Sequence, residues 1–186
     1  MLSLQFTRRF SMAHRLLSDR RSKCVVPHGH NEFVRATLTS PATPTFGAAN
    51  MQASFDQLKK RWHGWIDDHV DHAFQVNARD PLIEHFLKHE PDVVPRLMVF
   101  DGDPTTEALA YAFWRKLNAF LKEDAPEFRV ARIEIEETPT NTVSLDDSAW
   151  SAAEAAWSPG AWCDRADMTI NDLIPPAERA VLEACA

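Results

Sequence analysis

The chain of 186 residues is poor in cysteine and basic residues and has no long apolar segment. It has three cysteines, an odd number spread along the chain, so no disulfide framework is expected and a reducing compartment, the cytoplasm, is favoured. No apolar run approaches the roughly 18 residues of a membrane-spanning helix, and the first ten residues lack the apolar core of a signal peptide. Lys and Arg number 20 against 27 Asp and Glu. With a net charge of −7 and no basic stripe, neither a membrane nor nucleic acid is expected as a partner.

The residues that are present are typical of one folded domain. Hydrophobic residues make up 45% and charged residues 25% of the chain, which includes six Trp and eleven Phe. A disordered chain would not carry so many large aromatic side chains. This length is enough for one domain with a sizeable core.

Alternating and helical patterns predict the elements. Period-of-two alternation predicts strands over residues 2–14, 28–38, 93–100 and 128–138, with a bulge at Arg8-Arg9 in the first. A helix capped by Ser54 has an apolar face that extends to His69, and a second helix begins at Asp103-Pro104, with Asp103 as its cap. This order predicts an α+β fold with a four-stranded antiparallel sheet and two helices on one face.

The composition changes after Thr142. The segment becomes rich in Ala and Trp and ends in a short helical tail. We therefore expect residues 1–142 to form the domain, and residues 143–186 to form an extension packed on it.

Three histidines are the sharpest chemical feature. His28 and His30 have the same strand parity and point to one face, and Gly29 between them leaves space for a close backbone approach. His14 ends the preceding strand and can meet them across a hairpin. Three neutral imidazoles with one open position are typical of a catalytic Zn²⁺ site. The alternative is that all three are ordinary polar strand residues.

Cys24 lies four residues before this pair and allows three interpretations. It is a fourth zinc ligand, an inert buried thiol, or a thiolate that acts as a general base near the metal.

Two acidic positions are further candidates. Asp71 can fix the tautomer of His72 and raise its basicity, although both residues can instead solvate a helix end. Glu137 shares the parity of Ile133 and Ile135, which places a carboxylate on the apolar face, where an unpaired charge is costly. It therefore pairs with a base, binds a ligand that has N–H donors, or reaches water at a frayed strand end.

Taken together, these motifs resemble the 6-pyruvoyl-tetrahydropterin synthase / 6-carboxy-tetrahydropterin synthase family. The resemblance covers about residues 2–142. The segments that carry it, in chain order, are Ala13-His14, Cys24 with His28-Gly29-His30, Asp71-His72, Pro104-Thr105-Thr106-Glu107 and Glu137-Thr138. The register after His72 differs from the family pattern, which leaves His69 as a rival for the role of His72.

The resemblance implies a fold and an assembly. The fold is the tunnelling fold (T-fold), whose sheets join into a barrel within trimers. Two trimers stack to a homohexamer that has its active sites between subunits.

The resemblance also implies an activity and site residues. His14, His28 and His30 bind zinc, Cys24 is the general base, Asp71 and His72 relay protons, and Glu137 with Thr105 and Thr106 binds the pterin. The activity is that of a zinc-dependent carbon–carbon or carbon–oxygen lyase acting on 7,8-dihydroneopterin triphosphate. Its product is 6-carboxytetrahydropterin, for 7-deazaguanine and queuosine synthesis, or 6-pyruvoyl-tetrahydropterin. A non-catalytic, zinc-stabilised pterin-binding protein is the alternative from another class.

Overall fold

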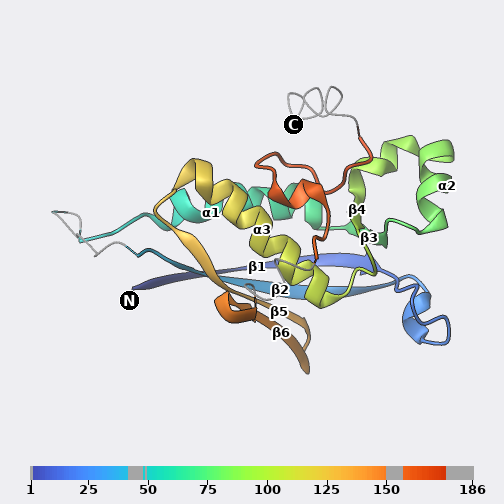
Figure 1. Ribbon diagram of the computed structural model, residues 1–186, viewed down its shortest axis with the longest axis horizontal. Helices are drawn as coiled ribbons and strands as arrows, with labels where there is room; N and C mark the ends of the chain where they lie inside the picture. Colours follow the sequence, from blue (N-terminus) through green and yellow to red (C-terminus); the bar gives the residue numbers. More distant parts are fainter. Residues whose placement is uncertain (1, 42–47, 49, 150–156, 175–186) are drawn as a thin grey trace.

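The computed structural model describes residues 2–41, 48, 50–149 and 157–174. Their strands form one mixed sheet with the order β4-β3-β1-β2-β5-β6, and the helices cover one of its faces (Figure 1). The predicted α+β class is confirmed. The strands are β1 (Ser3–His14), β2 (His28–Thr39), β3 (Ala73–Asn77), β4 (Leu97–Phe100), β5 (Arg129–Thr138) and β6 (Asn141–Asp146). The helices are α1 (Phe55–Trp65), α2 (Pro81–His89) and α3 (Thr106–Asp124).

The predicted four-stranded antiparallel sheet is wrong in its membership. The antiparallel part is β1-β2-β5-β6, whereas the segment predicted over residues 93–100 contributes only β4, which pairs in parallel with β3. β3 pairs with β1, also in parallel, through only three residues. β3, β6 and α2 were not predicted, because strands of five or six residues carry too little alternation to be distinguished from a loop.

β1 has no bulge. Its register with β2 is continuous from Ser3 opposite Thr39 to His14 opposite His28. Arg8 simply shares the parity of Phe6 and Phe10, and its guanidinium Nε donates to Asp67 at 2.6 Å. This ion pair at the edge of the helical layer lets a charged residue occupy the inward face of the strand.

The first helix begins as predicted but changes its geometry. The Ser54 hydroxyl accepts from the Gln57 amide at 3.1 Å, and α1 then ends at Trp65. The predicted helical face continues through one π-helical turn, η3 (Ile66–Val70). A π turn is frequent near functional sites, and this one delivers the chain directly to Asp71.

The second predicted helix, α3, begins later than expected. Thr105 is its N-cap, and the Thr105 hydroxyl accepts from the Ala108 amide at 3.3 Å. Asp103 is not the cap, because its carboxylate accepts hydrogen bonds from three other residues of the chain.

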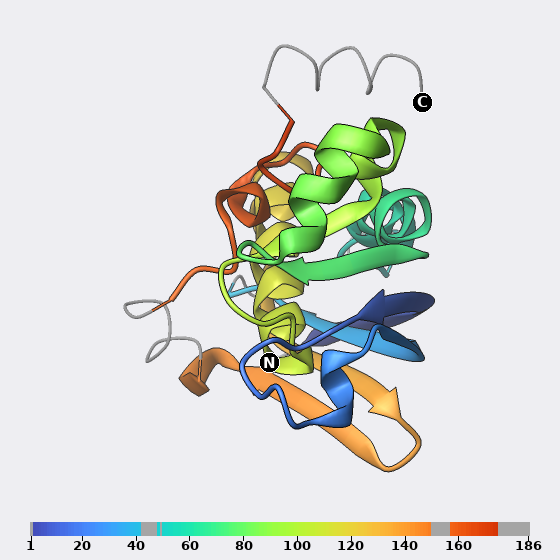
Figure 2. The same ribbon diagram turned by 90° about the vertical axis from the view of Figure 1, so that its right-hand side faces the viewer.

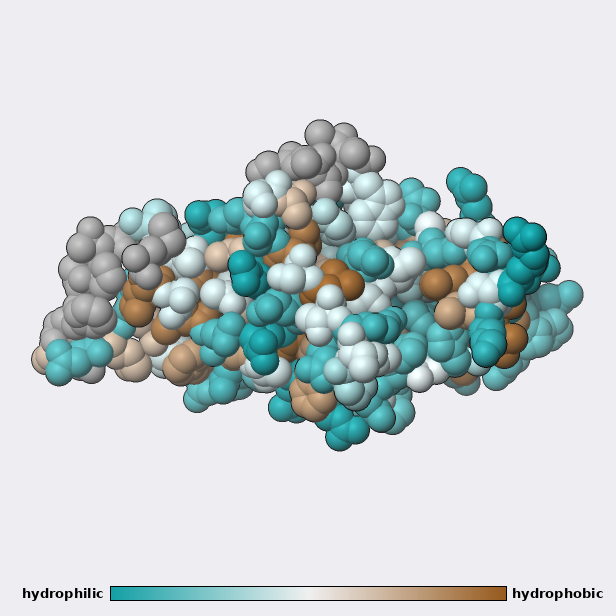
Figure 3. All heavy atoms as spheres, turned by 90° about the horizontal axis from the view of Figure 1, so that it is seen from below, coloured by the Kyte–Doolittle hydropathy of each residue, from teal (hydrophilic) through white to brown (hydrophobic). Residues whose placement is uncertain are grey.

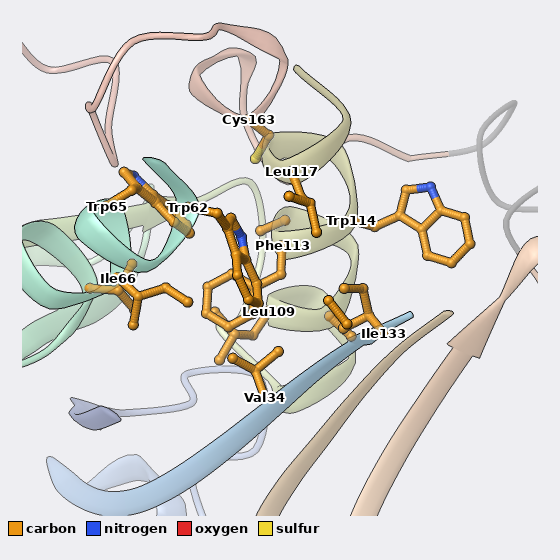
Figure 4. Packing of buried hydrophobic residues seen from close by; sticks show 14 of the residues in the cluster. Val34, Trp62, Trp65, Ile66, Leu109, Phe113, Trp114, Leu117, Ile133 and Cys163 are labelled. Carbon is orange, nitrogen blue, oxygen red and sulfur yellow. The ribbon is translucent and has the colours of Figure 1, made fainter. Parts of the chain in front are cut away.

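The main core lies between the sheet and the helices α1 and α3 (Figure 4). Phe113 of α3 is at its centre, with edge-to-face contacts to Trp62 at 5.9 Å and Trp65 at 5.5 Å. Val34 and Ile133 of the sheet close the core from below.

Residues 157–174, from the predicted extension, pack on the helical side and along the edge strand β4 (Figure 2). The Val99 amide donates to the Ile170 carbonyl at 3.1 Å, and the Trp162 indole donates to the Val99 carbonyl at 2.8 Å. β6 crosses residue 142, so the antiparallel sheet continues past the predicted domain boundary.

The sheet face opposite the helices is polar (Figure 3). Gln5 donates to Thr37 at 3.1 Å, Ser11 donates to Asn31 at 2.7 Å, and Arg35 pairs with Glu134 at 3.8 Å. Among the described residues, no helix is long and apolar enough to cross a membrane.

Candidate active site

The three predicted metal ligands come together at one end of the β1–β2 pair. The ring centroids of His14, His28 and His30 lie 4.6 to 5.2 Å apart, and one ring nitrogen from each lies within 4.8 Å of the others. The shared face follows from register, because His14 is directly opposite His28, and His30 is opposite Met12.

Hydrogen bonds fix the tautomers of two of these imidazoles. His14 Nδ1 donates to the Pro104 carbonyl at 2.9 Å, and His28 Nδ1 donates to the Val26 carbonyl at 2.8 Å. Carbonyl oxygens only accept, so both Nε2 atoms carry lone pairs in the neutral rings. These Nε2 atoms lie 3.1 Å apart.

Two lone pairs at this separation repel each other unless a cation lies between them. Burial lowers the pKa of His14, and the neighbouring His28 and His30 lower it further, which disfavours a proton as that cation. Two nitrogens that share one tetrahedral zinc ion are about 3.3 Å apart. The donor set therefore fits Zn²⁺.

Gly29 is required by the close approach of β1 and β2. A Cβ atom at this position would lie 2.6 Å from the Met12 carbonyl oxygen. The space expected at Gly29 from the sequence is therefore real, and it keeps His14 and His28 in register.

A pocket of about 480 Å³ lies next to His14. It is lined by Thr105 and Thr106 from the start of α3, Glu137 of β5, and residues 140–143 of the β5–β6 hairpin. Glu137 lies at a register shift between β5 and β6, and such a bulge turns a side chain away from the regular strand direction.

Glu137 is partly buried and accepts a hydrogen bond from the Thr106 hydroxyl at 2.7 Å. Within the part of the chain that the structure describes, no Lys or Arg pairs with it. The interpretation of Glu137 as half of a buried ion pair is therefore not supported here, and its second oxygen is available to a ligand.

Glu32 is a buried carboxylate that sequence reasoning did not single out. It is fully buried, and neither of its oxygens has a partner among the described residues. Burial, and after it the charge of Glu137, raises the pKa of Glu32 to about 8. Its parity with His28 and His30 was visible in the sequence, but its missing partners were not.

Cys24 lies in the loop that connects β1 to β2, in the short helix η1 (Lys23–Val25). Its thiol is free and partly buried, and its carbonyl accepts from the Leu16 amide at 2.8 Å. Leu16 in turn lines the pocket. The loop backbone therefore adjoins the pocket, although Cys24 is not among the lining residues.

Asp71 and His72 form the expected pair, but away from the pocket. His72 Nδ1 donates to Asp71 at 2.9 Å, and the other Asp71 oxygen accepts from the Ser11 amide at 2.6 Å. Partial burial opposes these two bonds, but together they lower the pKa of Asp71. The His72 side chain is 78% exposed, and His72 has a left-handed backbone with φ of 64°.

The Asp71 carboxylate thus takes His72 as its partner, whereas His69 lies within the π turn. Within one chain the pair is not brought to the three histidines. It faces outward at the edge of β1, next to Ser11.

Asp103 and Pro104 contribute contacts that the sequence did not reveal. Asp103 accepts from the Leu17 amide at 3.0 Å, the Ser18 amide at 2.8 Å and the Asn77 amide group at 2.9 Å. Burial opposes ionisation, but the bonds from Ser18, Asn77 and Leu17 outweigh it and lower the pKa of Asp103 to about 2. The only signal in the sequence was the position of Asp103 before a predicted helix.

Comparison with known proteins supports the resemblance. The family model of 6-pyruvoyl tetrahydropterin synthase matches residues 3–148. A probable 6-carboxy-5,6,7,8-tetrahydropterin synthase of Halobacterium salinarum is 28% identical over 134 residues, which are 72% of this chain and 79% of that protein.

Solved structures have the same fold. An uncharacterized protein from Wolinella succinogenes has a TM-score of 0.61 at 21% identity, covering 79% of this chain and 99% of that one. The 6-pyruvoyl tetrahydropterin synthase of Caenorhabditis elegans has a TM-score of 0.52 at 24% identity, covering 78% and 94%. With the family match extending over most of its length, the chain belongs to the 6-pyruvoyl tetrahydropterin synthase family.

Proposed function

We propose that this chain is a zinc-dependent lyase that converts 7,8-dihydroneopterin triphosphate to 6-carboxy-5,6,7,8-tetrahydropterin, a step toward 7-deazaguanines and queuosine. One observation carries the proposal: the facing lone pairs of His14 and His28 adjoin a pocket that presents the carboxylate of Glu137. The relative from Halobacterium salinarum, named for this product, supports the choice of reaction.

The residues of the pocket suit a pterin. A 2-amino-pyrimidinone edge offers adjacent N–H donors, which a carboxylate accepts through charge-assisted hydrogen bonds. Thr106 holds one oxygen of Glu137 at 2.7 Å and so orients the other toward the pocket. Thr105 and Thr106 add hydroxyl groups to the wall.

His14, His28 and His30 would hold the zinc ion. When bound, the ion acts as a Lewis acid that makes C–H protons next to the substrate hydroxyls more acidic. Cys24 would take one of these protons as general base, and His72, whose tautomer Asp71 fixes, would return a proton. Triphosphate and a carbon fragment leave.

A homohexamer with shared active sites completes the proposal. Among the described residues, β6 pairs only with β5, and β1 pairs on its other side only through its last three residues. These two strand edges are available for pairing between copies, which would join the sheets into a barrel. The exposed His72 at the β1 edge would then reach the pocket of a neighbouring copy.

Mass spectrometry of the products from dihydroneopterin triphosphate tests the reaction. The carboxy product supports the proposal. The pyruvoyl product, which the name of the matching family model favours, would replace it with the second candidate. No turnover by the zinc-loaded oligomer, with pterin binding retained, would leave a binding protein.

A further inference from the structure

Three parts of the candidate site come from segments that are distant in the sequence. His14 ends β1, Cys24 lies in the following loop, and Glu137 lies at the end of β5 with Thr106 beside it. Asp103 lies where these segments meet, and its contacts account for their relative placement.

The first set of contacts holds the loop that carries Cys24. The Asp103 carboxylate accepts from the amides of Leu17 and Ser18 at 3.0 and 2.8 Å, and from the Ser18 hydroxyl at 2.5 Å. The adjacent residue, Leu16, donates to the Cys24 carbonyl at 2.8 Å. The carboxylate thereby determines where the two sides of the loop meet.

The second set of contacts fixes the start of α3. Asn77, the last residue of β3, donates to the same carboxylate at 2.9 Å, and the Asp103 carbonyl accepts from the Thr105 amide at 2.9 Å. Between them, Pro104 presents its carbonyl to His14 Nδ1 at 2.9 Å. Thr106 then reaches Glu137.

We propose that Asp103 is a positioning residue, which sets the Cys24 loop, the ring of His14 and the Thr106–Glu137 pair relative to one another. The catalytic consequence rests on the proposed function, whereas the positioning itself does not. No neutral side chain of similar size can replace Asp103 fully, because its two oxygens face N–H and O–H donors on every side, and an amide would turn an NH₂ group toward one of them.

The test compares Asp103→Asn with Asp146→Asn. Asp146 is a matched control, because it also accepts from two backbone amides and a serine hydroxyl, but in the turn after β6, outside the pocket lining. The first measurement is the alkylation rate of Cys24 by iodoacetamide, followed at peptide level by mass spectrometry. The second is turnover of dihydroneopterin triphosphate, with zinc content and melting temperature recorded for every variant.

We expect Asp103→Asn to retain its fold and zinc, to alkylate several-fold faster at Cys24, and to lose about 10- to 100-fold in kcat with little change in KM, as a misplaced catalytic group does. Asp146→Asn should match the wild type in both measurements. A lowered melting temperature in Asp103→Asn with wild-type alkylation and kcat would overturn the proposal, since it would show a purely structural role.

If Asp103→Asn does not fold, Ser18→Ala keeps the carboxylate and removes one donor. Faster alkylation of Cys24 in that variant supports the proposal, and a wild-type rate overturns it. A wild-type protein without turnover would refute the proposed lyase activity alone, because the alkylation measurement does not depend on it.

Discussion

Glu32 is the residue whose environment differs most from that of an ordinary carboxylate. It is fully buried without a hydrogen-bond partner in the described chain, and burial raises its pKa to about 8. In the unfolded chain the group ionises near pH 4.5. The folded state therefore binds one proton more than the unfolded state between these two pH values, and its stability falls as pH rises through that window.

Glu32→Gln should remove this dependence. His63 has its pKa lowered by burial to about 4 and acts in the opposite direction, but only below its unfolded value of 6.5. From pH 6.5 to 8, the variant should gain roughly 2 kcal/mol of unfolding free energy relative to the wild type. Urea denaturation of both proteins at the two pH values measures the gain, and parallel pH profiles would contradict the prediction.

Gly29 connects backbone packing to the metal site. A methyl group in Gly29→Ala would lie against the Met12 carbonyl, so β1 and β2 must separate. We expect a loss of about 1–3 kcal/mol together with reduced zinc content, because His14 and His28 lie on either side of the contact.

Gly64→Ala is the matched control for this prediction. Gly64 lies in α1, and nothing lies within 4 Å of an added Cβ there. That change should stabilise the helix by about 0.5–1 kcal/mol and leave zinc content unchanged. Full zinc occupancy in Gly29→Ala would show that the register tolerates the methyl group.

Cys24→Ala separates the base from the ligand interpretation of this thiol. The three imidazoles already provide the nitrogen set of a zinc site. The variant should keep its fold and zinc but lose about 10²- to 10⁴-fold in turnover, the usual contribution of a general base. Metal analysis beside single-turnover kinetics checks both points, and loss of zinc would make Cys24 a ligand.

At the scale of elements, α3 holds the segment 157–174 through a buried lysine. Lys116 is fully buried and donates to the carbonyls of Trp162 and Thr169, both at 3.1 Å, and to Asp167 at 3.2 Å. Burial lowers the pKa of Lys116 to about 8, although Asp167 favours the charged form. The segment also covers the edge strand β4, so this anchor protects an edge that would otherwise be open to pairing.

Lys116→Met should therefore cost about 3–5 kcal/mol, because it leaves Asp167 and two buried carbonyls without their donor. Lys122→Met, at an exposed position of the same helix, should change stability by no more than about 0.5 kcal/mol. Urea midpoints of the two variants give the comparison. Equal midpoints would mean that the segment is held by its apolar contacts alone.

For the whole molecule, a bound metal contributes to stability through mass action. Chelation of zinc should lower the melting temperature, since a ligand at 100 times its dissociation constant contributes about 2.7 kcal/mol. Added Zn²⁺ should restore the original value. In His28→Ala the chelator should have no effect, and an equal shift in both proteins would place the metal elsewhere.

The face and the chemistry of the main strands could be read from the sequence. Alternation placed His14, His28 and His30 on one side, Gly29 marked the close approach of two strands, and Ser54 marked the start of α1. These features depend on neighbours in the chain or on the period of two, which is a local property of an extended backbone.

The tertiary structure alone decided which strands are neighbours and which polar groups meet. The parallel pair β3–β4, the tautomers of His14 and His28, the contacts of Asp103 and the unpartnered oxygens of Glu32 all depend on segments distant in sequence. Periodicity fixes the face of a residue but not the partner across from it. Which donor meets which acceptor is determined only when the core packs and brings those segments together.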